Sequence, residues 1–454
     1  MRKHRKEMTL VLVAFLASIG VAQEARPDRP GVAAAESAAP HHQWPQWRGP
    51  LATGVAPHGD PPIEWGETRN LRWKTPLPGH GHSTPIVWGE MIFLTMAVPF
   101  GKALEPRPST APGAHDNSPV THRQRFVVAG LDRRSGKILW QRPVREELPR
   151  EQGHVSGTLA SPSAVTNGRK IFASFGSFGI YALDLDGALV WEKDLGEMAT
   201  KHGHGEGSSP VLHGQTLFVN WDHEGESFVI ALDTADGAER WRIARDEASS
   251  WATPIVVEQA GRHQLIVPGT KRVRAYDTDS GEIVWECSGL SRNIVASPVA
   301  GHGMVFAGSS YDTRAMYGIR LDGSLGDITG TDQVVWSRRT RTPYVPSLLL
   351  LGEDLYFLRH YQNILTRVIA STGAEPGGPL RLEGLGNIYA SPVAAAGRIY
   401  ITDREGSTMV LAHGETPEIL ALNRIDEGVS ASAAIVGDMI FLRGETSLYA
   451  FGAR

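Results

Sequence analysis

Histidines spaced by glycine recur in the first half of the chain, at His80-Gly-His82 and His202-Gly-His204. Imidazole nitrogens and carboxylate oxygens are ligands for Zn²⁺, Cu²⁺ or Fe²⁺. The spacing of these histidines matches no named metal motif, so they define a candidate divalent-metal site without fixing its geometry. The candidate ligands are His82, His154, His202, His204 and Glu206.

A repeat must position these residues. A Ser/Thr-Pro pair followed by apolar residues recurs at intervals of 41–48 residues, with one longer interval of 77 between the first two copies. An insertion at about 98–124 explains the long interval. The copies are Thr84-Pro85, Ser161-Pro162, Ser209-Pro210, Thr253-Pro254, Ser297-Pro298 and Ser391-Pro392, with weaker forms at Pro346-Ser347 and Ser432-Ala433.

Each copy continues with short strands and a tight turn. The clearest turns run from Ala231 to Trp241 and from Ala275 to Trp285, with an Asp, a Gly and a Trp spaced four residues apart. The Asp can accept hydrogen bonds from the turn backbone, and the Gly can adopt a positive φ. The Trp then has a large apolar face to pack against the neighbouring sheet.

Four short strands per repeat match one blade of a β-propeller, and eight copies predict eight blades. The last copy ends at Phe451 after only three strands. Residues 70–75 carry a Trp that belongs to no blade, so we expect this N-terminal strand to pair with the C-terminal blade and close the ring. An open solenoid is the alternative. The fold class is therefore all-β, an eight-bladed propeller over residues 44–454.

Propeller geometry brings the candidate residues to one face. Strand one of a blade leaves this face and strand two returns to it, so the residues before each Ser/Thr-Pro pair lie beside the loops between strands two and three. His154 and His202 both precede a proline by eight residues, which predicts equivalent positions in adjacent blades. The insertion belongs to the same face, as a lid or a disordered loop. Further side chains expected there include Tyr311, Tyr344, Tyr361 and Asn387.

The Ala-x-Asp-x-x-x-Gly-x-x-x-Trp turns resemble those of the PQQ-like (pyrroloquinoline quinone) propeller repeats, a WD40-like repeat architecture. Residues 44–50 and 70–78 look like the first strand of secreted bacterial members. The resemblance implies two kinds of relative, the quinoprotein dehydrogenases with PQQ and Ca²⁺ and the cofactor-free scaffold of the outer-membrane β-barrel assembly machine. The adjacent cysteine pair of the alcohol dehydrogenases is absent, since Cys287 stands alone, and so is the lipidated cysteine of the scaffold.

The resemblance suggests a second interpretation of the same face, as a quinone site. Basic side chains could pair with the carboxylates of PQQ, and an indole could stack on its rings. A third interpretation is a hydrated polar funnel, or a docking surface for a protein, a glycan or a small molecule. The candidate cofactor-binding residues are Trp251, Lys271, Arg292, Asn293, Arg359, His360 and Tyr389.

The N-terminus predicts export. Four basic residues precede an apolar stretch from Met8 to Val21, and small residues before Gln23 are typical of a signal-peptide cleavage site, so residues 1–22 are expected to be removed. The alternative is a membrane anchor, but the stretch is short for a spanning helix. Residues 23–43 read as a flexible tether. The expected location is the periplasm or the exterior, with no transmembrane segment after cleavage.

Composition narrows the function classes. The net charge is −4 and the basic residues form no blocks, which argues against nucleic-acid binding. We found no nucleophile elbow and no phosphate-binding glycine loop before a helix. The sequence therefore favours an exported binding module or scaffold of the cell envelope. A PQQ-dependent alcohol or sugar dehydrogenase, or a metal-binding propeller, is the alternative, and no catalytic residue is assigned.

Overall fold

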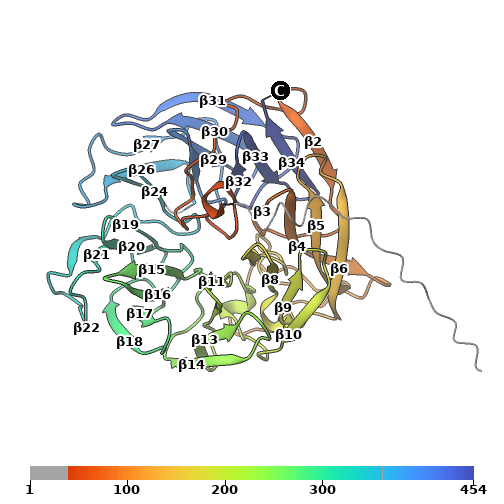
Figure 1. Cartoon of the computed structure of the whole chain (residues 1–454), viewed down its shortest axis with the longest axis horizontal. Helices are drawn as coiled ribbons and strands as arrows, with labels where there is room; N and C mark the ends of the chain where they lie inside the picture. The colour runs from red at the N-terminus through yellow and green to blue at the C-terminus, as the bar shows by residue number, and fades with distance from the viewer. Residues whose placement is uncertain (1–38, 360, 454) are drawn as a thin grey trace, which may run out of the picture. The chain divides into compact units, whose positions relative to one another are not determined.

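The Ser/Thr-Pro repeats fold into eight small sheets arranged in a ring, as predicted (Figure 1). The computed structural model describes residues 39–359 and 361–453. The predicted signal peptide, most of the predicted tether and His360 lie outside the described residues. None of the described helices is long and apolar enough to cross a membrane; they are the short 3-10 helices η1 (Pro40–His42), η2 (Gly176–Phe178) and η3 (Lys201–Gly203).

In the first four blades the strands follow chain order from the axis outwards. Blade 4 gains an extra strand that pairs in parallel with its outermost one. Blade 1 has β3 (Ile86–Trp88), β4 (Met91–Phe100), β5 (Arg123–Asp132) and β6 (Ile138–Glu147). Blade 2 has β7 (Val165–Thr166), β8 (Lys170–Ser174), β9 (Ile180–Asp184) and β10 (Leu189–Lys193). Blade 3 has β11 (Val211–His213), β12 (Thr216–Trp221), β13 (Ser227–Asp233) and β14 (Glu239–Arg245). Blade 4 has β15 (Ile255–Gln259), β16 (Arg262–Pro268), β17 (Arg272–Asp277), β18 (Ile283–Ser288) and the added β22 (Gly326–Asp327).

The other four blades keep this order, and the last two also take up strands from the N-terminal part of the chain. Blade 5 has β19 (Val299–Gly301), β20 (Met304–Ser309), β21 (Ala315–Arg320) and β23 (Val334–Arg338). Blade 6 has β24 (Leu349–Leu351), β25 (Asp354–Leu358), β26 (Ile364–Ile369) and β27 (Leu380–Arg381). Blade 7 has β28 (Val393–Ala395), β29 (Arg398–Thr402), β30 (Ser407–Ala412), β31 (Glu418–Arg424) and the added β1 (Val55–Ala56). Blade 8 has β32 (Ala434–Val436), β33 (Met439–Arg443), β34 (Ser447–Gly452) and β2 (Leu71–Pro76).

The N-terminal strand β2 closes the ring. It pairs antiparallel with β34 in blade 8, with Leu71 opposite Phe451 and Pro76 opposite Ser447. The predicted closure is therefore confirmed, and the first and last blades share no open seam.

Trp residues of the outer strands join several of the blades to the next one. The indole nitrogen of Trp191 donates to the carbonyl of Thr234 at 3.1 Å, and that of Trp241 donates to Thr278 at 3.0 Å. Each ring covers the turn glycine of the following blade, and a Cβ at Gly237 or Gly281 would approach it within 2.8 Å. Both glycines have positive φ, 75° and 76°. The turn therefore requires glycine for its conformation and for this close packing.

Buried Ser and Thr side chains join neighbouring blades near the axis. In blades 2 to 8 one buried Ser or Thr hydroxyl accepts a hydrogen bond from the backbone N–H of the equivalent residue in the preceding blade, at 2.8–3.0 Å. The hydroxyl of Thr84 completes the circle by donating to the carbonyl of Ser432 at 3.0 Å. We call these residues the Ser/Thr ring: Thr84, Ser163, Ser209, Thr253, Ser297, Ser347, Ser391 and Ser432.

The Ser/Thr ring corrects the repeat register of blade 2. Its member there is Ser163, and not Ser161, whose hydroxyl instead donates to Thr158 within its own loop at 2.9 Å. His154 thus precedes its ring residue by nine positions and His202 by seven. The prediction that these histidines are equivalent is wrong, because Ser161-Pro162-Ser163 offers two serines and the proline marked the wrong one.

Residues 44–50 do not form the expected blade strand. Residues 44–60, which include the short strand β1 of blade 7, form an axial segment inside the ring, drawn in red and orange in Figure 1. Trp44 exchanges backbone hydrogen bonds with Val87 of blade 1. The buried guanidinium of Arg48 donates to the carbonyls of Leu348 and Pro392, both at 2.6 Å, in blades 6 and 7. The axial segment therefore ties blade 1 to blades 6 and 7 through backbone carbonyls.

The insertion is anchored to two neighbouring blades. Strands β4 and β5 extend into the predicted range, which leaves a loop at 101–122. The amide of Asn117 donates to the carbonyl of His202 at 2.8 Å, and the N–H of Val155 donates to the carbonyl of Asp116 at 2.8 Å. These contacts hold the loop against blades 2 and 3.

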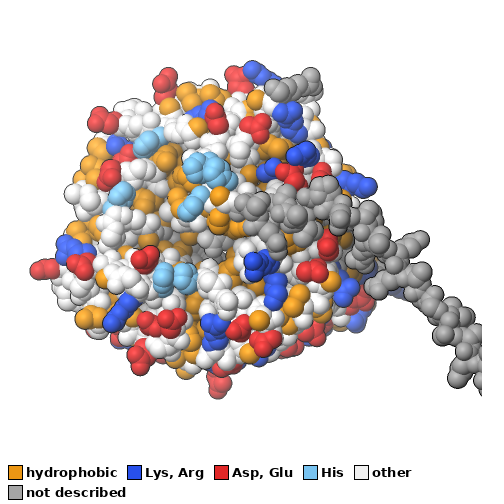
Figure 2. Space-filling view, viewed as in Figure 1, with side chains coloured by type: hydrophobic (Ala, Val, Ile, Leu, Met, Phe, Trp, Pro, Cys, Tyr) orange, Lys and Arg blue, Asp and Glu red, His pale blue; other side chains and the backbone are white. Residues whose placement is uncertain are grey.

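Charged side chains of both signs are interspersed around the face drawn in Figure 2. Both blue and red groups occur around its drawn rim.

Candidate functional site

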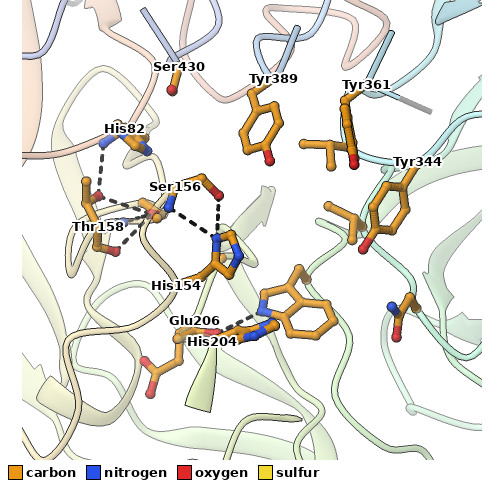
Figure 3. Close-up of a pocket in the computed structure, with 18 of the residues that line it drawn as sticks. His82, His154, Ser156, Thr158, His204, Glu206, Tyr344, Tyr361, Tyr389 and Ser430 are labelled. Atoms are coloured by element: carbon orange, nitrogen blue, oxygen red, sulfur yellow. Dashed lines mark hydrogen bonds between the residues drawn. The ribbon is translucent and has the colours of Figure 1, made fainter. Parts of the chain in front are cut away.

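A cavity of about 550 Å³ lies at the axis of the propeller (Figure 3). Every blade contributes to its lining, and the most regular contribution is the residue two positions before each member of the Ser/Thr ring. Trp47 of the axial segment also lines it, and lines a separate cavity of about 510 Å³ as well. Trp47 therefore stands between the two spaces. The residues two positions before the ring are His82, Ser161, Gly207, Trp251, Val295, Val345, Tyr389 and Ser430.

Imidazoles gather on one wall of the cavity. The ring centroids of His154 and His204 are 4.8 Å apart, and those of His202 and His204 are 5.4 Å apart. His115 of the insertion joins them, at 4.9 Å from His204 and 4.7 Å from His202. The structure thus brings together three of the predicted metal ligands and adds a fourth histidine. We call His115, His154, His202 and His204 the imidazole cluster.

The hydrogen bonds of these imidazoles show where their protons lie. Nδ1 of His154 accepts from the backbone N–H of Ser156 at 3.1 Å, which places its proton on Nε2. Burial lowers the pKa of His154, lowers that of His204 to about 4 and lowers that of His82 to about 3. These three side chains are therefore neutral near pH 7 and contribute hydrogen bonds rather than positive charge.

Glu206 is separate from the imidazole cluster. Its carboxylate accepts hydrogen bonds from the backbone N–H of Ser177, at 2.8 Å, and from the Ser177 hydroxyl. Gly176 makes room for it, since a Cβ there would overlap the carboxylate. Figure 3 shows this carboxylate turned away from His154 and His204. Burial raises the pKa of Glu206 to about 7.

The residues predicted to hold a metal do not form one shell. Within residues 39–359 and 361–453, no group of three or more His, Cys, Asp or Glu side chains is arranged to hold a metal ion. His82 lines the cavity apart from the imidazole cluster, and Glu206 is bound to Ser177. We therefore derive no metal chemistry from this wall.

Tyrosines form the opposite wall. The rings of Tyr311 and Tyr344 stack at 5.6 Å, Tyr344 lies 6.2 Å from Tyr361, and Tyr361 lies 5.8 Å from Tyr389. The Arg404 guanidinium lies 4.7 Å from the centroid of the Tyr389 ring. Blades 5, 6 and 7 thus present a continuous aromatic arc, of which Figure 3 labels three members. We call Tyr311, Tyr344, Tyr361 and Tyr389 the Tyr wall.

Between these two walls lie Trp251 and Asn293, two of the predicted cofactor-binding residues. The indole nitrogen of Trp251 donates to the carbonyl of Gly205 at 2.8 Å, which fixes its ring at the junction of blades 3 and 4. The Asn293 amide oxygen accepts from Nζ of Lys201 at 2.6 Å. Tyr389, the third predicted residue in the lining, belongs to the Tyr wall.

Three predicted basic residues lie outside the lining. Nζ of Lys271 lies 3.2 Å from the carboxylate of Asp246, and the side chain of Arg292 is exposed. Arg359 is half-buried but does not line the cavity. His360 is outside the described residues.

The positions of these residues decide whether the cavity could hold PQQ. PQQ is a polycarboxylate, and in the described lining Lys201 is the one Lys or Arg side chain, already bonded to Asn293. The described carboxylates of the lining, Asp116 and Glu206, would repel an anion. The lining does not fit PQQ, so we derive no reaction step through it.

His115, Asp116, Trp47 and Lys201 also line the cavity and were not predicted to. The face assigned to the insertion could have pointed to His115 and Asp116. Nothing in the repeat pattern indicates Trp47, because the axial segment contains no repeat. Lys201 directly precedes a predicted histidine, but its hydrogen bond to blade 5 depends on the curvature of the ring.

Comparisons with known proteins agree with this architecture. The family model described as outer membrane protein assembly factor BamB matches residues 176–289 and 226–453. No curated protein matches the chain. BamB from Moraxella catarrhalis is similar at 16% identity, with 79% of this chain and 99% of that chain covered and a TM-score of 0.52.

Dehydrogenase propellers are similar as well. Quinohemoprotein alcohol dehydrogenase from Comamonas testosteroni shares 11% identity, with 93% of this chain and 84% of that chain covered and a TM-score of 0.62. A europium-containing methanol dehydrogenase shares 11% identity, with 93% and 100% covered and a TM-score of 0.60. At such identities the likeness is one of fold. Because the family model matches more than half of the 454 residues, the chain belongs to the PQQ-like β-propeller family described as outer membrane protein assembly factor BamB.

Proposed function

We propose that this chain is an exported binding module of the cell envelope, and that its ligand occupies the axial cavity between the imidazole cluster and the Tyr wall. The observation that carries the proposal is the asymmetry of the lining. All eight blades supply a residue at the same position, yet the types range from Gly and Val to Trp and Tyr. A propeller that needed only to fill its axis could use one residue type throughout.

The size and chemistry of the cavity support a ligand of small-molecule dimensions. Its volume of about 550 Å³ lies within the range of about 300–1,000 Å³ typical of such sites. The walls combine aromatic faces with a few fixed polar groups, among them Asn293 and His154. Such a mixture supplies both contact area and orientation.

Export is supported by the pattern of residues 1–22 and by the name of the matching family. We propose cleavage before Gln23 and a location in the periplasm or outside the cell. N-terminal sequencing of the protein recovered from the envelope fraction tests this. A sequence starting at Gln23 supports export, and an intact Met1 in the cytoplasmic fraction contradicts it.

The binding role is tested with the mature protein, residues 23–454. A thermal-shift screen would cover oligosaccharides, peptides and quinones, for the wild type and for Trp251→Ala. We expect at least one compound to raise the melting temperature of the wild type and to have less effect on the variant. If compounds stabilise both proteins equally, or none stabilises the wild type, the cavity is not a ligand site.

A further inference from the structure

The Tyr wall offers ring faces rather than an apolar surface alone. Its members come from three consecutive blades, and neighbouring rings are stacked or tilted with their centroids 5.6–6.2 Å apart. Trp251 adds an indole whose orientation is fixed by its bond to Gly205. The faces of aromatic rings carry partial negative charge, so they attract C–H groups that carry partial positive charge.

Hydroxyl and amide groups accompany these rings. Ser156, Thr158, Ser161 and Ser430 line the cavity on the side of His82, and Figure 3 labels three of these serine and threonine residues beside it. Some of these groups already bond to each other, as Thr158 does to Ser161 at 3.1 Å. An apolar ligand would cover them without offering partners, which costs free energy for each unsatisfied group.

Full charges are scarce in the lining. Among the described lining residues, the Asp, Glu, Lys and Arg side chains are Asp116, Lys201 and Glu206. Lys201 is bonded to Asn293 and Glu206 to Ser177. A strongly charged ligand would therefore lack counter-charges in the cavity, and desolvating it there would be costly.

A ligand with weakly polarised C–H faces, hydroxyl groups at its edges and no net charge satisfies all three conditions. We propose that the axial cavity binds a short, uncharged oligosaccharide, with a sugar ring stacked on the Tyr wall and its hydroxyls bonded to Asn293, His154 and the serine side. This inference rests on the proposed binding function and names its ligand class. The Tyr389 ring, which lies both in the Tyr wall and two positions before Ser391, is the central contact.

The test is a calorimetric titration of mature protein with cellotetraose, maltotetraose, mannotetraose and chitotetraose. We expect saturable binding of at least one, weakened about tenfold by Tyr389→Ala and changed less than about threefold by Tyr389→Phe, which keeps the ring. The matched controls are His302→Ala, in a turn between β19 and β20, and Leu422→Ala, on the outer strand β31. Both should bind like the wild type.

The outcomes separate this inference from the binding function itself. If none of the four sugars binds, or if Tyr389→Ala binds as tightly as the wild type, the saccharide assignment is overturned. If a peptide from the thermal-shift screen binds instead and Trp251→Ala weakens it, the cavity is a ligand site of another class. If no compound of any class binds, both proposals fail.

Discussion

Two concentric sets of residues at the axis differ sharply. The Ser/Thr ring repeats one hydrogen bond seven times between blade 1 and blade 8, and each of its members is 6 % exposed or less. Two positions earlier in each blade, the eight cavity-lining residues are of six types, from Gly and Val to Trp and Tyr. The contrast indicates two roles. The positions that are alike in every repeat, such as the Ser/Thr ring, hold the blades together, and we call them the frame. The positions that differ between repeats line the cavity, and we call them the site.

The largest expected effect breaks the repeating frame at its outer side. Trp241→Ala removes an indole that covers Gly281 and bonds to Thr278. We expect a loss of about 3–5 kcal/mol in the free energy of unfolding, typical of removing a buried aromatic ring. Denaturant titration measures it. Trp251→Ala, a cavity residue of the same type, should cost less, and an equal loss would erase the distinction between frame and site.

A smaller effect breaks the frame at the axis. Ser297→Ala leaves the buried N–H of Thr253 without its acceptor at 2.8 Å, and we expect a loss of about 1–3 kcal/mol. The comparison variant is Ser430→Ala in the cavity lining, which should change unfolding by less than about 0.5 kcal/mol. If both variants lose the same free energy of unfolding in denaturant, the Ser/Thr ring stabilises the fold no more than the cavity lining does.

We expect the buried histidines of the cavity to destabilise the fold in acid. The pKa values of His82 and His204 are lowered to about 3 and about 4, while unfolded histidine titrates near about 6.5. The unfolded chain therefore binds more protons as pH falls from 6.5 towards 4, and stability is lost across that window. We expect His204→Gln to flatten the fall in melting temperature. If the melting temperature of the variant falls with pH as steeply as that of the wild type, His204 does not contribute to the loss of stability in acid.

Glu206 acts in the opposite direction. Its pKa is raised to about 7, so the folded protein holds a proton there that the unfolded chain releases above about 4.5. Its ionisation destabilises the fold near neutral pH, and this penalty is relieved as pH falls from 7 to 4.5. Glu206→Gln should therefore steepen the acid-induced loss. A shallower curve in the same melting experiment would mean that Glu206 is ionised in the folded state.

The smallest expected effect is none at all. PQQ, with or without Ca²⁺, should give no saturable heat in calorimetry, because the described lining presents one Lys, bonded to Asn293, and no Arg. Micromolar binding that is lost in Trp251→Ala would contradict this and restore the quinone interpretation of the cavity.

The sequence allowed the frame to be predicted because the repeat is redundant. Eight copies, the turn spacing and the unpaired strand at residues 70–75 all indicate the same ring. One ambiguous copy, at Ser161-Pro162-Ser163, therefore gave a wrong register for blade 2 but left the predicted fold unchanged. The cavity had no such redundancy. Trp251, Asn293 and Tyr389 were placed from strand order alone, since they lie close to the Ser/Thr ring.

Loop residues could not be placed in that way. Lys271 lies beside Asp246 and Glu206 bonds to Ser177, and both contacts depend on local partners that no spacing indicates. The axial segment was equally hidden, because Arg48 bonds to carbonyls 300 and 344 residues away.

The most direct test of the frame-and-site account measures stability and affinity on the same two variants. Ser297→Ala and Tyr389→Ala would each be unfolded in denaturant and titrated by calorimetry with the tetrasaccharide that binds the wild type. The account predicts that Ser297→Ala loses stability and keeps its affinity within about threefold, while Tyr389→Ala loses about tenfold in affinity with a smaller loss of stability. Parallel losses of both quantities in both variants would contradict it.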